Sequence, residues 1–216
     1  MALQQQEKNQ PHIVQIMTTE HYNLQSGRSL TVSDANGRAA LFLSTVSTTL
    51  VALAFIGNIS HLGTAFVVFA LVLFPSLFFL GLVTFDAVLQ SAIEETVYTR
   101  GINRIRHLYV ELAPQVKEYF ILSTHDDTVG IFRRARWWQS FLTLAGMIAV
   151  INSILAGAFT GLLVAQLSTL SLPLSVIAGA GVFLVVLVVH QRYQVSQWRQ
   201  NTQNLTVLFP REAPQQ

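Results

Sequence analysis

Four apolar runs of membrane-spanning length constrain the fold of this chain more than any other feature. A helix rises about 1.5 Å per residue, so it needs roughly 20 apolar residues to cross a hydrocarbon core about 30 Å thick. Each run approaches or exceeds that length, and none contains Asp, Glu, Lys or Arg. The runs are residues 39–59, 64–85, 139–163 and 172–189. We therefore expect an all-α integral membrane protein with four transmembrane helices in two hairpins.

The composition agrees with a membrane protein. Only 11% of the residues are charged and 51% are apolar, whereas a soluble domain ordinarily carries about 25% charged residues. Cysteine is absent, which excludes disulfides, thiolate metal sites and a thiol nucleophile. Because the N-terminus is polar, we expect no removable signal peptide.

The basic residues predict how the chain is threaded through the membrane. All thirteen Lys and Arg residues lie in the N-terminal tail, in residues 86–137 or in the C-terminal tail, and the connections 57–63 and 166–172 contain none. Cytoplasmic loops are enriched in Lys and Arg, so we expect both termini and residues 86–137 in the cytoplasm and the protein in the plasma (inner) membrane. The basic residues form no continuous face with interleaved aromatic residues, so no nucleic-acid partner is expected.

The same pattern divides the chain into six expected segments. They are a disordered Gln-rich tail (1–17), a cytoplasmic or interfacial helix (18–38), a first transmembrane hairpin (39–85), a cytoplasmic amphipathic helical segment (86–137), a second transmembrane hairpin (138–190) and a cytoplasmic tail (191–216).

Small residues recur at four-residue spacing in the first and third spans. Such rows let helix backbones approach closely, and hydroxyl groups in them can instead line a path for water or ions. Asn152 is the most polar group at membrane depth and needs a hydrogen-bond partner, for which its own copy in another subunit is one candidate. The positions assigned to helix packing or pore lining are Ser44, Thr48, Ala145, Ala149, Asn152, Ser153, Gly157 and Gly161.

Proline and the clustered charges mark further features. Pro75 removes one backbone hydrogen bond and is expected to kink the second span. Basic residues followed by two tryptophans are typical of the membrane–water interface. The expected interfacial collar consists of Arg133, Arg134, Arg136, Trp137 and Trp138.

The cytoplasmic segment begins as an amphipathic helix. Apolar residues recur at three- to five-residue steps until Pro114, where we expect the helix to stop. The apolar side can pack within the chain, against residues 115–124, or against the same helix of another subunit. The residues assigned to a surface for a cytoplasmic protein partner are Arg100, Arg104, Arg106 and Tyr109.

Potential metal ligands cluster only at His125, Asp126 and Asp127. Adjacent side chains do not converge easily on one ion, so a solvated turn that caps a following helix is the favoured interpretation. We expect no metal ion or cofactor.

Several classes of function do not fit these residues. His61 and His190 lie at opposite ends of the spans, no carboxylate lies between them, and no other catalytic constellation is evident at depth. Ion-coupled transport generally uses a membrane-embedded carboxylate, and the spans contain none. The protein is therefore expected not to be an enzyme, which leaves passive conduction, membrane disruption or a role as sensor or scaffold.

A short motif connects the chain to a known type of protein. In the motif Ser33-Asp34-Ala35-Asn36-Gly37-Arg38-Ala39-Ala40-Leu41-Phe42-Leu43 a polar helix runs directly into the first hairpin, which a long cytoplasmic helix follows. Over about residues 20–112 this arrangement resembles small bacterial membrane effectors of the SLATT and Pycsar transmembrane type. The resemblance implies an effector that compromises the inner membrane in anti-phage defence after a nucleotide signal. The chain differs in having a second hairpin and no recognisable nucleotide-binding domain.

Two functions from different classes are therefore expected. The first is a non-enzymatic homo-oligomer in the bilayer, either a channel or a membrane-perturbing effector, gated from the cytoplasm. The alternative is a membrane-anchored scaffold or sensor that recruits a cytoplasmic protein through residues 86–137.

Overall fold

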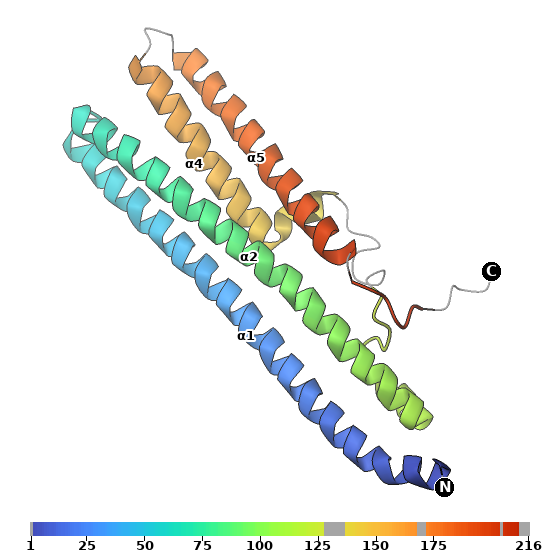
Figure 1. The fold of residues 1–216 in the computed structure, drawn as a ribbon. Helices are drawn as coiled ribbons and strands as arrows, with labels where there is room; N and C mark the ends of the chain where they lie inside the picture. The colour runs from blue at the N-terminus through green and yellow to red at the C-terminus, as the bar shows by residue number, and fades with distance from the viewer. Residues whose placement is uncertain (1, 128–136, 168–171, 204, 212–216) are drawn as a thin grey trace. The chain divides into compact units, whose positions relative to one another are not determined.

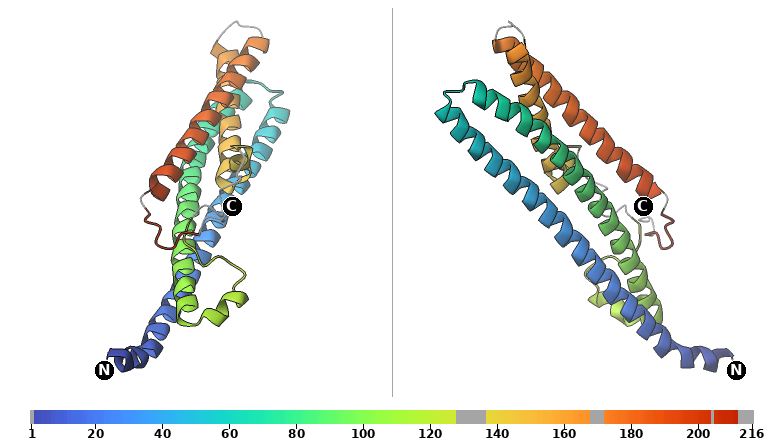
Figure 2. Two further views of the ribbon diagram at one scale, coloured as in Figure 1. Left: turned by 90° about the vertical axis from the view of Figure 1, so that its right-hand side faces the viewer. Right: turned by 60° about the vertical axis from the view of Figure 1, so that its left-hand side comes forward.

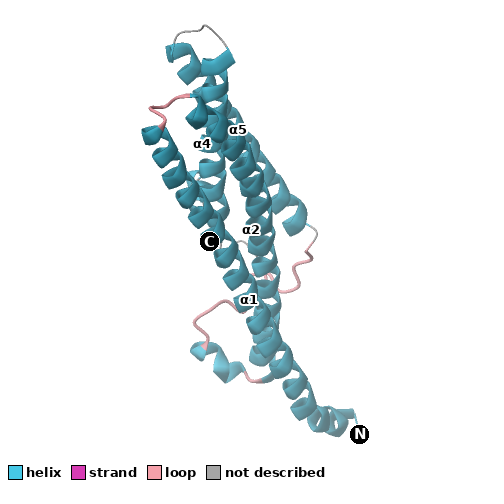
Figure 3. Cartoon of the chain, turned by 90° about the vertical axis from the view of Figure 1, so that its left-hand side faces the viewer, coloured by secondary structure: helices cyan, strands magenta, loops and turns pink. Residues whose placement is uncertain are grey.

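The structure is a computed structural model that describes residues 2–127, 137–167, 172–203 and 205–211. Most of these residues are helical, the remainder form turns and loops, and no strand occurs among them (Figures 1 and 3). The elements are α1 (Ala2–Ile59), α2 (Thr64–Leu112), the 3-10 helices η1 (Pro114–Tyr119) and η2 (Trp137–Leu142), α4 (Leu144–Leu167) and α5 (Leu172–Gln203).

The all-α class expected from the sequence is confirmed. Within the described residues, α1, α2, α4 and α5 each contain a stretch long and apolar enough to cross a membrane. This finding supports a multi-pass membrane protein.

The chain forms two compact units. We call them the apolar unit, Asp34–Gln90 with Ala135–Asn201, and the polar unit, Met1–Ser33 with Ser91–Arg134 and Thr202–Gln216.

The apolar unit is built around one buried face of each of several helices. On α1 the buried face contains Ala39, Phe42 and Val46, and Phe42 is only 1% exposed. These residues are three or four positions apart, the spacing that places side chains on one side of a helix. The matching buried residues are Ala70, Leu77, Phe85, Val88 and Leu89 of α2 and Ala145, Ile148, Ala149 and Leu155 of α4.

Helices α4 and α5 lie side by side in the apolar unit (Figures 1 and 2) and touch through glycines. A Cβ added to Gly157 would lie 2.8 Å from the carbonyl oxygen of Gly179, and one added to Gly179 would lie 2.7 Å from that of Gly157. Only residues without a side chain permit this backbone contact.

In the polar unit, glycines of α1 and α2 leave room for side chains of the other helix. A Cβ on Gly27 would lie 3.0 Å from the Tyr98 ring, and one on Gly101 would lie 3.0 Å from Leu24. An ion pair between Arg28 and Glu95, 2.8 Å long, joins the same two helices.

The ends of the helices agree only partly with expectation. α2 ends at Leu112, two residues before Pro114, as predicted. α1 begins at Ala2, however, so residues 2–17 of the stretch for which we expected disorder are helical, and the helix continues without a break through residue 38. The disorder prediction considered how little residues 1–17 could bury and gave too little weight to helix propensity, which is high for Ala, Leu, Gln, Glu and Lys.

Candidate functional site

A buried polar pair lies inside the apolar unit. Asn152 of α4 is fully buried, and its Nδ2 lies 3.4 Å from Nε2 of His190 on α5. His190 Nδ1 lies 2.8 Å from the carbonyl oxygen of Val186, to which it donates. The imidazole therefore offers Nε2 as an acceptor, and the Asn152 amide donates to it. The partner of Asn152 is thus a histidine of the same chain, whereas its own copy in another subunit had been one candidate from the sequence.

The other atom of the Asn152 amide has no hydrogen bond. Oδ1 is buried without a partner, and a Cβ added to Gly81 of α2 would overlap with it. Gly81 therefore leaves the space that Oδ1 occupies. A buried acceptor without a donor costs about 1–3 kcal/mol. The contact between Asn152 Oδ1 and Gly81 therefore adds no stability by itself.

The row of small residues on α4 packs within the chain. Ala145, Ala149 and Ser153 are buried, and the Ser153 hydroxyl donates to the Ala149 carbonyl at 2.7 Å. Gly157 meets Gly179, and a Cβ on Gly161 would lie 3.3 Å from the Ser175 carbonyl oxygen of α5. These contacts place Gly157 and Gly161 at the α4–α5 contact of one chain, and the other members of the row are buried within that chain.

The row on α1 behaves differently. Ser44 and Thr48 are exposed, together with Ala40, Ser47 and Ala52, and we call these five residues the α1 hydroxyl face. The neighbouring Thr45 hydroxyl donates to the Leu41 carbonyl at 2.8 Å, but the hydroxyls of Ser44, Ser47 and Thr48 make no hydrogen bond within the described part of the chain. The structure thus separates the two rows that the sequence had grouped together.

Pro75 lies inside α2, which continues through it from Thr64 to Leu112. The adjacent Ser76 hydroxyl donates to the carbonyl of Val72 at 2.8 Å. The kink at Pro75 stays a prediction.

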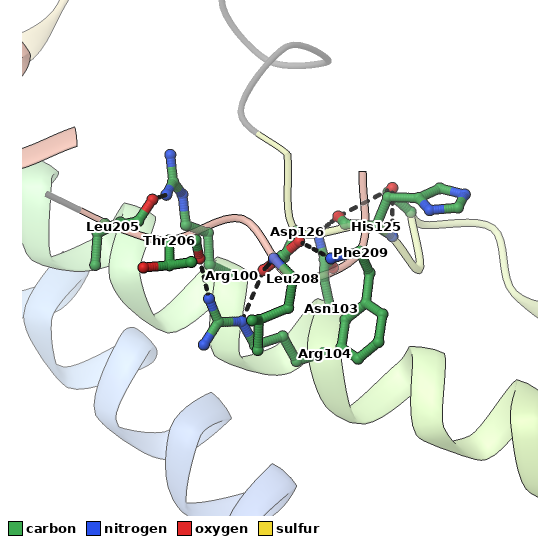
Figure 4. Close-up of polar contacts among 10 residues, drawn as sticks. Arg100, Asn103, Arg104, His125, Asp126, Leu205, Thr206, Leu208 and Phe209 are labelled. Atoms are coloured by element: carbon green, nitrogen blue, oxygen red, sulfur yellow. Dashed lines mark hydrogen bonds and ion pairs between the residues drawn. The ribbon is translucent and has the colours of Figure 1, made fainter. Parts of the chain in front are cut away.

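In the polar unit, Asp126 holds the C-terminal segment 205–211 (Figure 4). Its carboxylate accepts the backbone N–H of Leu208 at 3.0 Å and that of Phe209 at 2.8 Å, and it pairs with Arg104 Nε at 2.7 Å. Asp126 is 1% exposed. In the same segment, the Phe209 ring stacks on the His107 ring, with ring centroids 4.0 Å apart.

The buried carboxylate stays ionised because of these contacts. Burial alone would raise the pKa of Asp126, but the N–H groups of Leu208 and Phe209 and the Arg104 guanidinium outweigh it, so the pKa is lowered. The expectation of a solvated turn at His125–Asp127 is therefore wrong for Asp126: it is a buried anchor for a distant segment.

All four residues assigned to a partner surface make contacts within the polar unit. Arg100 donates to the Leu205 carbonyl at 3.3 Å and is 6% exposed, and Arg104 donates to the Thr206 carbonyl as well as to Asp126 (Figure 4). Arg106 donates to Asn103 Oδ1 at 3.0 Å. Tyr109 stacks on His21 and its hydroxyl lies 3.4 Å from that of Thr18. The partner surface stays a prediction, but Arg100 and Arg104 bind the chain's own C-terminal segment here.

Comparison with known proteins finds no significant match: no family model, no curated protein and no solved structure. The geometry of the chain itself therefore carries the functional argument. Among the described residues, no group of three or more His, Asp or Glu side chains could hold a metal ion.

The interfacial collar falls largely outside the described residues. Arg133, Arg134 and Arg136 lie outside them, as do the side chains of Trp137 and Trp138.

The docked C-terminal segment is the feature that sequence reasoning missed. We expected residues 191–216 to form a cytoplasmic tail and assigned no contacts to its end, yet 205–211 are held by Asp126, Asp127, Arg100 and Arg104. One signal was present: Leu205, Val207, Leu208 and Phe209 form an apolar cluster within an otherwise polar stretch, and such a cluster needs a surface to cover it.

Proposed function

We propose that the protein is a non-enzymatic, multi-pass protein of the plasma (inner) membrane that assembles with copies of itself and conducts across or perturbs the bilayer. In this proposal the two transmembrane hairpins are residues 39–85 and 138–190, and the termini and residues 86–137 are cytoplasmic. The exposed α1 hydroxyl face carries the proposal.

The argument rests on where these hydroxyl groups lie. Ser44, Ser47 and Thr48 are within a span that contains no charged residue, and their side chains face away from the rest of their own chain. A hydroxyl placed in hydrocarbon without a partner is costly. One hydroxyl can donate to the carbonyl four residues earlier, as that of Thr45 does, but those of Ser44, Ser47 and Thr48 do not in the described part of the chain. Two further environments remove the cost, namely a polar contact with another helix and a water-filled path.

Both environments require more than one chain. The four-residue spacing of Ala40, Ser44, Thr48 and Ala52 is the spacing that lets two helices approach closely. An outward face of one chain encloses a water path only when other chains complete the wall. The glycines of the α4 row contact α5 and the other members are buried within the chain, so we place the contact between copies on α1 rather than on the third span.

The resemblance to SLATT and Pycsar membrane effectors agrees with the membrane-perturbing form of this proposal.

The alternative is a membrane-anchored scaffold or sensor, and one observation favours it. Tyr119, Ile121 and Leu122 of the polar unit are 82%, 99% and 57% exposed. Exposed apolar residues that are adjacent in this way are a typical contact for a protein partner.

The deciding experiment compares native mass and the efflux of ions and a small dye from reconstituted liposomes. The test variant is Ser44→Leu/Thr48→Leu, and the control is Ser76→Leu, an exposed hydroxyl in α2 that is bonded to its own helix. Two leucines should overfill a close helix contact, at a cost of roughly 1–3 kcal/mol per site. We expect the test variant to shift the native mass toward the monomer and to change efflux, and the control to resemble the wild type.

A monomeric wild-type protein in a native-like bilayer would contradict the proposal and leave the scaffold. Equal masses and equal efflux for both variants would remove the α1 hydroxyl face from the contact.

A further inference from the structure

A groove in the apolar unit lies along the C-terminal half of α5, next to η2. Its volume is about 560 Å³, and Phe141 of η2 forms part of its lining. The wall on α5 is one face of that helix, because Val188, Arg192, Val195 and Arg199 follow one another at steps of three or four residues.

The groove has an apolar part and a basic part. Phe141, Leu187 and Val188 line it at one end, where α5 is still within its charge-free run. Arg192 and Arg199 line it further along, and both are exposed. No acidic residue lines the groove, and neither arginine forms an ion pair with a carboxylate in the part of the chain that the structure describes.

A polar atom without a partner lies between these parts. Gln191 also lines the groove, and its Oε1 accepts the hydroxyl of Ser140 at 2.9 Å. This bond fixes the orientation of the amide. The remaining atom, Nε2, is a buried donor without a hydrogen bond. An acceptor oxygen in the groove would satisfy it.

The order of these residues along α5 matches the layers of a membrane surface. The charge-free run ends at residue 189, so Arg192 follows it by roughly 4–5 Å of helix and Arg199 by roughly 15 Å. Arg192 is at the depth of the lipid phosphates, whereas Arg199 lies beyond it and reaches back, because side chains on a helix lean toward its N-terminus. The apolar side chains just before Arg192 are at the depth of the acyl chains. A soluble anion would need the arginines but not the apolar wall.

We propose that this groove binds an anionic phospholipid. Arg192 and Arg199 hold the headgroup phosphate, Gln191 Nε2 donates to a phosphate or ester oxygen, and Phe141 and Val188 contact an acyl chain. The inference rests on the membrane placement of the proposed function, but it does not depend on assembly or conduction.

The test is native mass spectrometry of the full chain, supplied with equal amounts of phosphatidylglycerol and phosphatidylcholine. The variant is Arg192→Gln/Arg199→Gln. The control is Arg38→Gln, which removes an exposed arginine at the start of another span, where it pairs with Asp34 at 2.7 Å. We expect the wild type and the control to retain phosphatidylglycerol preferentially, and the variant to lose that preference by roughly tenfold or more.

Two outcomes would overturn the lipid site. One is equal retention of the two lipids by the wild type, or an equal preference in the variant and the control. The other is displacement of phosphatidylglycerol by glycerol phosphate, which would show that the site recognises the phosphate alone.

Flotation of the same proteins with liposomes separates this proposal from the proposed function. Co-flotation of the wild type and the variant, with the lipid preference lost only in the variant, supports both. If the wild type fails to co-float, the membrane placement itself is wrong and the lipid site is withdrawn with it.

Discussion

In the apolar unit, a single glycine can determine whether a side chain of a neighbouring helix has room to pack. Asn152 is the clearest case, because its amide lies in space that exists only where α2 carries Gly81. The sequence shows Asn152 as an isolated polar residue in an apolar run. It does not show that a glycine 71 positions earlier, on another helix, accommodates it.

This contact leads to a prediction for Gly81→Ala. The added Cβ would overlap with Asn152 Oδ1, so we expect the free energy of unfolding to fall by roughly 1–3 kcal/mol. Gly37→Ala is the matched control, since a Cβ there meets nothing within 4 Å and alanine favours a helix. The measurement is thermal unfolding in detergent.

A second substitution tests the cause. In Gly81→Ala/Asn152→Ala the overlapping oxygen is gone, so part of the loss caused by Gly81→Ala should be recovered. Equal unfolding temperatures for Gly81→Ala and Gly37→Ala would show that the contact is not as tight as described.

At the scale of elements, the C-terminal segment 205–211 depends on one carboxylate. The pKa of Asp126 is lowered by N–H groups of the segment and by Arg104, so the ionised form favours docking. The lowered pKa couples protonation of Asp126 to release of the segment. The stabilisation of the docked segment by Asp126 is complete above the pKa of a free aspartate, about 3.9, and is lost as the pH falls through the lowered pKa of the docked state.

We therefore expect the segment to be docked at pH 7 and released as the pH falls well below 4. Asp126→Asn should release it at pH 7 already, because the amide loses the ion pair with Arg104 and part of its acceptor capacity, at a cost of about 1–3 kcal/mol. Hydrogen exchange at the amides of Leu208 and Phe209, corrected for the intrinsic pH dependence, reports both changes.

Asp34→Asn serves as the control for this measurement, since Asp34 is exposed and pairs only with Arg38 among the described residues. Unchanged protection of Leu208 and Phe209 in Asp126→Asn would mean that the Phe209–His107 stack and the other bonds hold the segment without the carboxylate.

The elements also show how far the sequence could predict this fold. Long apolar runs identify the helices, because no other structure satisfies the backbone at that length in lipid, and Pro114 marks the end of α2 correctly. A four-residue row of small residues predicts a close contact but not its partner. The rows around Gly157 and Ser44 have the same spacing, yet one packs against α5 and the other is exposed.

The buried anchor at Asp126 could not be predicted for a related reason. Its partners are backbone N–H groups of Leu208 and Phe209, more than eighty residues away. Backbone donors are present at almost every residue, so the sequence around Asp126 contains no mark of them. Only the apolar cluster near the C-terminus hinted that the segment packs on something.

At the scale of the whole molecule, the proposed threading makes a prediction that the composition renders easy to test. The chain has no cysteine, so a single introduced thiol reports its own position. Asn58 and Lys117 are both exposed. The proposed topology places Asn58 at the non-cytoplasmic end of the first span and Lys117 in the cytoplasm, since the connection 57–63 contains no basic residue and residues 86–137 contain seven.

In intact cells a membrane-impermeant thiol reagent should label Asn58→Cys and leave Lys117→Cys unlabelled, and lysis should make both reactive. Moving a basic residue across the bilayer is costly. Translocation of residues 86–137 would move seven basic residues, whereas translocation of the connection after Asn58 would move none. The reverse pattern would invert the topology and put the C-terminal segment and Asp126 outside the cell. Labelling of both in intact cells would contradict a first hairpin that returns to the cytoplasm, and with it the assignment of residues 86–137 as the cytoplasmic side of the protein.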